Sequence, residues 1–423
     1  MTKVEKIIHG DCLNVLKTME DNSVDSVVTD PPYGLSKEPD INEVLSKWLA
    51  GEEYDHGHGG FMGKSWDSFV PHPDIWAEVY RVLKPGGHAL VFAGTRTQDL
   101  MTISLRLAGF EVRDVIEWLY FSGFPKSHDV SKAFDRRAGA EREKVGEYTI
   151  SGTVDIQGGN YNSGKTTTKT LDITAPATEL ARKWDGWGTA LKPAHEPIIV
   201  VRKPLVDADT GRKLTVADCV EKYGTGAINI DASRIATDDS LGGGLTSGSV
   251  LKIDGFDRPW MHDKDVIEAK KKEAHDKIAK AEALGRFPAN CITLDSDEFY
   301  SKYFNVTPQE LSKKASKKDR NSDWQGEGIT LEERVAGGLQ GRADGSLGKT
   351  TYIRNHHPTV KPTDLMAWLV RLVTPAGGTV LDPFAGSGST LVAAKREGFG
   401  FIGIDREAEY IEIIEARTGE EAK

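Results

Sequence analysis

A carboxylate followed by two prolines and an aromatic ring stands near the start of the chain, where residues 29–34 read TDPPYG. The exocyclic amine of adenine is a poor nucleophile, because its lone pair is delocalised into the ring. Asp30 and the Pro31 carbonyl can accept its N–H bonds and stabilise the positive charge that develops as nitrogen attacks a methyl sulfonium. Pro31 and Pro32 fix the turn, and Tyr33 offers a ring face on which a base can stack.

The same motif has a purely structural alternative, in which a Pro-Pro turn stops a strand and Asp30 caps it. The position favours chemistry, because open α/β sheets bind ligands at the carboxyl ends of their strands. Methyl transfer of this kind needs no metal. The His56/His58 and His356/His357 pairs are accordingly interpreted as loop residues and not as metal ligands.

A second motif lies near the end of the chain, where residues 381–390 read LDPFAGSGST. Gly386 and Gly388 remove Cβ atoms where a strand must turn into a helix and let a ligand approach the backbone. Asp405 ends the next predicted strand, about 20 residues later, where a carboxylate accepts hydrogen bonds from ribose hydroxyls. Leu391 replaces the third glycine of the dinucleotide fingerprint. The motif therefore predicts a nucleotide-like cofactor but makes no strong case for NAD.

Residues 159–166, GNYNSGKT, match the phosphate-loop pattern. That motif needs a buried strand before it and a helix after it. The flanking stretches are short and polar or rich in β-branched residues, so we interpret the match as a surface loop. The alternative is an NTPase built around Lys165.

Elements that could position these motifs occur at both ends of the chain. Strands are predicted at 4–9, 24–29, 88–94, 110–120, 196–202, 378–382 and 400–404. Helices are predicted at 13–19, 76–83, 97–108, 363–373, 389–397 and 407–417, with a charged helical stretch at 263–284. Alternating strands and helices predict a mostly parallel sheet that is covered on both faces. Residues 145–175, rich in Gly, Ser and Thr, are expected to be loop or irregular β structure.

The composition fits a soluble globular protein of 423 residues, with 38% hydrophobic and 28% charged residues. Neither a secretory signal nor a membrane span is evident, and a cytoplasmic location is expected. Cys12, Cys219 and Cys291 are too widely spaced for a disulfide framework or a zinc site. The net charge of −10 argues mildly against nucleic-acid binding over the whole surface but permits a local basic face.

The two motifs, in this order, resemble the S-adenosylmethionine (SAM)-dependent DNA amino-methyltransferases of the β arrangement, of bacterial or phage adenine-N6 type. In that arrangement the catalytic DPPY precedes the FxGxG cofactor loop. The resemblance covers roughly 5–125, 190–205 and 355–417, including HGDC at 9–12, RVLKPGG at 81–87 and HPTVKP at 357–362. It implies a Rossmann-like, seven-stranded α/β sheet, circularly permuted, with a mixed target-recognition region inserted.

The resemblance also implies a division of labour along the chain. The catalytic residues would be Asp30, Pro31, Pro32 and Tyr33. The cofactor would contact Asp11, Cys12, Asp30, His357, Thr359, Lys361, Asp382, Phe384, Ala385, Gly386, Ser387, Gly388 and Asp405. The domain would comprise residues 1–125, a strand at 186–205 and residues 351–423, with an insert at 126–185 that contacts DNA and a target-recognition region at 206–350.

The expected reaction moves a methyl group from SAM, leaving S-adenosylhomocysteine, to N6 of an adenine flipped out of double-stranded DNA. Cytosine N4 is the alternative target, although such enzymes more often carry Ser at the position of Asp30. RNA or protein-amide methyltransferases, a further alternative, more often carry Asn there. Trp118 or Phe121 would form a second wall for the base, or both are core aromatics.

Partners follow from the same resemblance. A basic run is a candidate phosphate contact through Lys313, Lys314, Lys317, Lys318 and Arg320. A solvated loop is the equally weighted alternative. Family members often form homodimers, and the lack of a nuclease constellation favours an orphan modification enzyme.

Overall fold

The computed structural model describes residues 3–35, 38–57, 68–120, 127–152, 167–235, 264–293, 305–306, 355, 357 and 359–420. The chain divides into two compact units. One contains residues 1–121 and 195–423, and the other contains residues 122–194. Both motifs of interest lie in the first unit.

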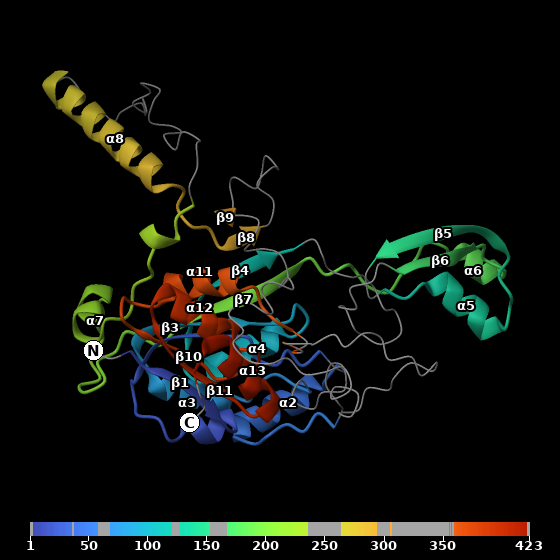
Figure 1. Ribbon diagram of the computed structural model, residues 1–423, viewed down its shortest axis with the longest axis horizontal. Coiled ribbons are helices and arrows are strands. Elements are labelled where there is room, and N and C mark those ends of the chain that lie inside the picture. The colour runs from blue at the N-terminus through green and yellow to red at the C-terminus, as the bar shows by residue number, and fades with distance from the viewer. Residues whose placement is uncertain are drawn as a thin grey trace. The chain divides into compact units, whose positions relative to one another are not determined.

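The first unit is built on one mixed sheet (Figure 1). Its nine strands lie in the order β1 (Glu5–His9), β11 (Gly400–Asp405), β10 (Thr379–Asp382), β2 (Val24–Thr29), β3 (Leu83–Phe92), β7 (His195–Arg202), β4 (Glu111–Leu119), β8 (Cys291–Thr293) and β9 (Asn305–Val306). Strand β7 is antiparallel to both its neighbours, and the other described pairs are parallel. The sequence predicted the seven longer strands, and two short edge strands from 206–350 extend the sheet.

The strand order confirms the predicted circular permutation. Strand β10, which precedes the Gly-rich turn, comes near the C-terminal end of the sequence but lies between β11 and β2 in the sheet. Its own connection leads to β11 on one side, whereas β2 on its other side belongs to the start of the chain. The order therefore reverses beside β10, and such a switch point leaves a ligand-binding crevice at the carboxyl ends of the strands.

Helices cover both faces of this sheet, because neighbouring strand residues point to opposite faces. One face packs against α11 (Thr363–Val373), α12 (Ser389–Glu397) and α13 (Ala408–Thr418), and its buried cluster includes Val28, Leu90 and Ile198. The other packs against α1 (Cys12–Leu16), α2 (Ile41–Ala50), α3 (Pro73–Val82) and α4 (Gln98–Leu107). Its cluster includes Val27 and Val91.

The sequence placed a break at Lys84–Gly87, but strand β3 begins at Leu83 and runs through these residues. Gly86 has a φ of +74°, and a Cβ there would lie 2.7 Å from the Cys219 Sγ atom of α7 (Val216–Tyr223). The glycine lets the strand pass close to this helix. The pairing with β2 jumps from Val24–Leu83 to Ser26–His88, so residues 84–87 form a bulge in β3.

The second unit contains α5 (Val130–Ala138), a hairpin of β5 (Lys144–Gly152) and β6 (Thr167–Thr174), and α6 (Glu179–Lys183). Loop or irregular β structure was expected for 145–175, and the described parts form an antiparallel hairpin, so the β alternative holds for them. The nearly fully buried Asp135 carboxylate receives Arg142 Nη1 at 2.7 Å and the Thr178 backbone N–H at 2.9 Å. These bonds join α5 to the segments that flank the hairpin, at Arg142 and Thr178. The alternation of residues within a strand does not predict such long-range contacts.

The remaining described helices are the 3₁₀ turn η3 (Asp231–Ser233) and α8 (Lys264–Leu284). Helix α8 has 21 residues, as predicted for 263–284, and carries the ion pair Glu273–Lys277 with a separation of 2.6 Å. Within the described residues, no helix combines the length and apolar character needed to cross a membrane.

Candidate active site

The two motifs lie at the ends of neighbouring strands. Strands β10 and β2 pair in parallel, with Leu381 opposite Val27. One pair later, the Thr29 hydroxyl donates to Asp382 Oδ1 at 2.7 Å, across 353 residues of sequence. The TDPPYG turn and the Gly-rich turn therefore leave the sheet side by side, at the predicted crevice.

A compact charged cluster forms where the TDPPYG turn leaves the sheet. The Lys361 ammonium lies 2.6 Å from Asp30 Oδ2, 3.1 Å from the Tyr33 hydroxyl and 3.4 Å from Glu196 Oε2. The Tyr33 hydroxyl donates to the same Glu196 oxygen at 3.1 Å. Lys361 is only 7% exposed, so these contacts are shielded from water. Three separate segments thus supply two carboxylates, one ammonium and one phenol.

Burial and charge act in opposition on this cluster. Burial raises the pKa of Asp30, Lys361 opposes that rise, and Glu196 adds to it. Burial alone would lower the pKa of Lys361, but Asp30 and Glu196 outweigh it and raise that pKa. The pKa of Tyr33 is held well above its usual value, first by burial and then by the two carboxylates, so its hydroxyl stays a donor. With both carboxylates ionised, the cluster carries one excess negative charge.

The Gly-rich turn fits a nucleotide-like cofactor. Gly386 and Gly388 adopt φ values of +53° and +75°, in the left-handed region that favours glycine. A Cβ on Gly386 would lie 2.9 Å from His357 Nε2. Glycine, which has no Cβ, therefore keeps the space between the turn and this ring open. The Asp405 carboxylate accepts from the Gly386 N–H at 2.8 Å and from the Glu407 N–H at 2.9 Å. The residues present can therefore hold SAM.

The buried acids beside the turn are costly to ionise. Burial raises the pKa of Asp405 to about 6, although backbone N–H groups of Glu407 and Gly386 oppose this. Burial raises the pKa of Asp382 to about 6 as well, against hydrogen bonds from Thr390 and Thr29. A carboxyl with a raised folded-state pKa stabilises the fold below its unfolded pKa and loses that contribution as pH rises. The window here runs from about 4 to about 6.

Asp405→Asn should therefore change the stability of the fold and the affinity for SAM in opposite directions. At pH 7 the variant should unfold at a higher temperature than the wild type, because the fold no longer holds a buried carboxylate. Its SAM affinity should fall by about 10- to 100-fold, because a hydrogen bond to a charged group is worth about 1.5–3 kcal/mol. Calorimetric unfolding at pH 4 and pH 7 and titration with SAM check both. A stability gain as large at pH 4 would contradict the electrostatic cause.

The other predicted cofactor residues surround the same turn. The Gly10 N–H donates to the Asp405 carbonyl at 2.9 Å, which places the HGDC turn beside this acid. Asp11 caps α1 by accepting from the Asn14 N–H at 3.1 Å. Burial raises the pKa of Cys12 to about 12, so its side chain is a neutral thiol.

The HPTVKP segment spans both halves of the site. His357 packs edge-on against Tyr410, with ring centroids 4.5 Å apart, and its Nδ1 accepts from the Thr359 N–H at 3.3 Å. His357 lies over the Gly-rich turn, whereas Lys361 reaches Asp30 four residues later. The structure thus places Lys361 in the charged cluster, and its predicted contact with the cofactor stays a prediction.

Two residues of the site escaped the sequence analysis. Glu196 precedes the buried run of β7. Arg417 is 1% exposed, and its Nη1 donates to the Ser387 carbonyl at 2.6 Å, which holds the Gly-rich turn from behind. Its signal is its spacing from Tyr410, Ile413 and Ile414, which places this arginine on the apolar stripe of α13.

The structure also addresses the aromatic and basic candidates. Trp118 is 2% exposed and packs against Phe92 and Tyr120 in the core, so the core alternative holds for it. Phe121, the basic run, His58, His356 and Lys165 lie outside the described residues. His56 is described, stacks on Phe69 and belongs to no described group of three or more potential metal ligands.

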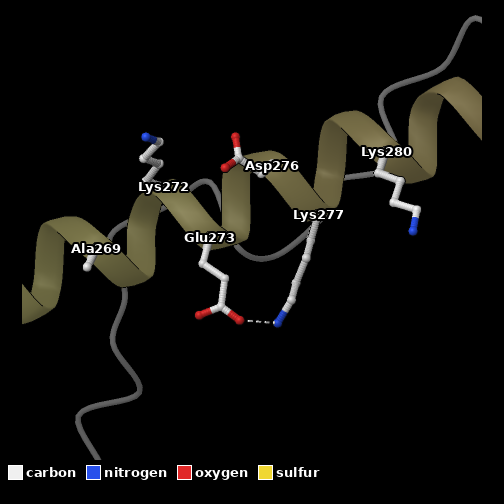
Figure 2. A pocket seen from close by; sticks show the side chains of 6 residues that line it. All are labelled: Ala269, Lys272, Glu273, Asp276, Lys277 and Lys280. Carbon is white, nitrogen blue, oxygen red and sulfur yellow. Dashed lines mark hydrogen bonds and ion pairs between the residues drawn. The ribbon is translucent and has the colours of Figure 1, made fainter.

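Hollows occur among the described residues beside α8 and beside the TDPPYG turn. A hollow of about 440 Å³ runs along α8 and is lined by Lys272, Glu273, Asp276 and Lys277 among others. Figure 2 shows Lys272 and Asp276 on one side of the helix and the ion pair of Glu273 and Lys277 on the other. A second, of about 250 Å³, is lined by Gly34, Arg96 and Thr97 among others. The Thr97 hydroxyl donates to the Tyr33 carbonyl at 2.6 Å, so this second hollow adjoins the TDPPYG turn.

Comparison with known proteins finds a family model and several relatives. A family model described as DNA methylase matches residues 24–416. The chain is 22% identical to the type II methyltransferase M.HindIII of Haemophilus influenzae, over 98% of this chain and 96% of that protein. It is 51% identical to M2.DpnII, a type II methyltransferase of Streptococcus pneumoniae, over 14% of this chain and 23% of that protein. The crystal structure of the M1.HpyAVI–SAM complex is 14% identical, with 98% and 100% of the two chains covered and a TM-score of 0.36.

Proposed function

The chain belongs to the DNA methylase family, and from this premise we propose that it methylates the N6 amino group of an adenine extruded from double-stranded DNA. It is a SAM-dependent DNA methyltransferase of the N6/N4 class. The observation that carries the finer proposal is the charged cluster at the end of β2, where Asp30 and Lys361 meet 2.6 Å apart. That cluster lies next to the turn that can hold SAM.

SAM, when bound, supplies an electrophilic methyl group on a sulfonium. Gly386 and Gly388 would hold it through the backbone, Asp405 through its ribose and His357 over the turn. Asp30 orients the target amine by accepting one of its N–H bonds, and the Pro31 carbonyl accepts the other. The excess negative charge of the cluster then stabilises the positive charge that develops on nitrogen.

The target base must leave the duplex, because its amine cannot otherwise reach the methyl group. Unstacking costs a few kcal/mol, and stacking on an aromatic ring returns about 1–3 kcal/mol. Tyr33 is the proposed stacking partner. The hollow lined by Gly34, Arg96 and Thr97 lies beside this turn, where an extruded nucleotide would pass.

Adenine is proposed over cytosine because Asp stands at position 30, where cytosine-N4 enzymes more often carry Ser. We expect N6-methyladenine, in excess over the host background, in DNA from a methylation-deficient host that expresses the protein. Mass spectrometry of the digested nucleosides measures it, with the Asp30→Ala variant as the control. N4-methylcytosine as the sole product would overturn the choice of adenine.

DNA recognition is proposed for 206–350, with phosphate contacts from Lys313, Lys314, Lys317, Lys318 and Arg320 and a second contact from 126–185. A homodimer and an orphan role without a nuclease are also proposals. All of these assignments derive from the resemblance and the charge pattern, and the described residues of 206–350 add only β8, β9, α7, α8 and η3.

A further inference from the structure

We propose that Glu196 is a positioning residue that draws the Lys361 ammonium away from Asp30 when the target amine enters. This inference rests on the proposed function and adds a residue and a movement to it. In the structure Lys361 lies within ion-pair distance of both acids, at 2.6 Å from Asp30 and 3.4 Å from Glu196. Only a small movement of the ammonium is therefore needed to exchange partners.

The lysine competes with the target for the same acceptor. An ammonium has three donors and no acceptor, and Asp30 Oδ2 accepts one of the hydrogen bonds that Lys361 donates. A target amine must donate to the same carboxylate for its lone pair to localise. While Lys361 holds Asp30, the carboxylate is less able to accept and its negative charge is already neutralised. Full stabilisation of the developing positive charge by Asp30 therefore requires Lys361 to find another counter-charge.

Glu196 is placed to supply that counter-charge. It lies on β7, paired on both sides by β3 and β4, with Trp118 opposite it in the register. Its side chain is 17% exposed and also accepts from the Tyr33 hydroxyl at 3.1 Å. Without a second carboxylate, Lys361 would be stranded in a buried site whenever it left Asp30, which is strongly unfavourable. Glu196 makes the exchange possible without moving the backbone.

The charge of the cluster also favours the movement of Lys361 from Asp30 to Glu196. Two carboxylates share one ammonium, so one negative charge is uncompensated before the substrates bind. If Lys361 pairs with Glu196, the uncompensated charge resides on Asp30, next to the nitrogen that becomes cationic. Asp30 is faced by Lys361, Tyr33, Glu196 and, from β10, Asp382. Among these groups Glu196 offers Lys361 a second negative charge at 3.4 Å, whereas the Tyr33 hydroxyl, although closer at 3.1 Å, is uncharged.

Glu196→Gln tests the proposal, because glutamine keeps an acceptor for Tyr33 but removes the charge that attracts Lys361. We expect kcat for DNA methylation to fall by about 100-fold, as for a misplaced catalytic group. The SAM dissociation constant, measured without DNA, should stay within about two-fold, because Glu196 does not belong to the Gly-rich turn. The acidic limb of the pH–kcat profile should move to lower pH, because the negative charge of Glu196 raises the pKa of Asp30.

Glu196→Asp keeps the negative charge but, with one methylene fewer, holds the carboxylate farther from Lys361. It should lower kcat while leaving the acidic limb of the profile where the wild type has it. Glu111→Gln is the matched control, since Glu111 lies in the same sheet and pairs with Arg202 at 2.7 Å. It should match the wild type in kcat and pH profile. Thermal unfolding of each variant shows that any loss of rate is not a loss of fold.

A double-mutant cycle with Lys361→Met decides whether Glu196 acts through the lysine. If it does, Glu196→Gln should change kcat much less in the Lys361→Met background than in the wild type. Equal effects in both backgrounds, or a Glu196→Gln enzyme with wild-type kcat, would overturn the proposal. A wild-type protein that methylates no adenine would instead overturn the proposed function, so the two failures are distinguishable.

Discussion

Asp30→Ala is expected to lower kcat for DNA methylation by at least about 1,000-fold, because it removes the acceptor that acts mainly in the transition state. The variant also changes the cluster from one excess negative charge to none, since Lys361 and Glu196 remain as a pair. SAM binding depends on the Gly-rich turn and should stay within about two-fold of the wild type. Single-turnover kinetics and SAM titration measure the two effects separately.

The fold should survive this substitution. Lys361 keeps a carboxylate 3.4 Å away in Glu196, so alanine at 30 does not leave an unpaired buried charge. Asp21→Ala is a suitable control, because Asp21 is exposed and pairs with Arg81 on the surface. It should retain wild-type kcat. An Asp30→Ala variant with normal kcat, or one that lost SAM binding with kcat intact, would show that the carboxylate is not the amine acceptor.

Gly386→Val is expected to weaken SAM binding by more than about 100-fold. Valine is strained at a φ of +53°, and left-handed backbone costs an L-residue roughly 1–2 kcal/mol. Its Cβ would also lie 2.9 Å from His357 Nε2, so the ring must move into the space over the turn. Because the same N–H of residue 386 is held by Asp405, the distortion reaches the ribose-binding acid as well. Equilibrium titration with SAM measures the loss.

Gly51→Val is the control that introduces backbone strain without a steric clash at the cofactor turn. Gly51 ends α2 with a φ of +72°, and a Cβ there would meet nothing within 4 Å. This variant should be less stable than the wild type but bind SAM with unchanged affinity. If Gly386→Val bound SAM normally, or if Gly51→Val weakened binding equally, the turn would not be the cofactor cradle.

The sequence by itself determined the seven longer strands of the main sheet, most of the helices that cover it and the two turns at the crevice. Helix α11 was predicted at 363–373 and is found there, because its apolar residues recur at helical spacing after a proline. TDPPYG and the Gly-rich turn each follow a buried strand, and strand ends of a parallel sheet meet at one edge. The order of the two motifs then predicted a permuted sheet, which the position of β10 confirms.

Only the tertiary structure decided how the charges of the site are arranged. Lys361 and Asp30 are separated by 331 residues in the chain, and Glu196 comes from a strand that runs against its neighbours. Local pattern is a property of a few consecutive residues, whereas an ion pair depends on which strands become neighbours. Arg417 and the strand through Gly86 follow the same rule, since each is explained by a distant partner, Ser387 or Cys219. The spacing of apolar residues predicts where helices and strands form. Which charged side chains meet in a buried site depends on how segments distant in the sequence pack together.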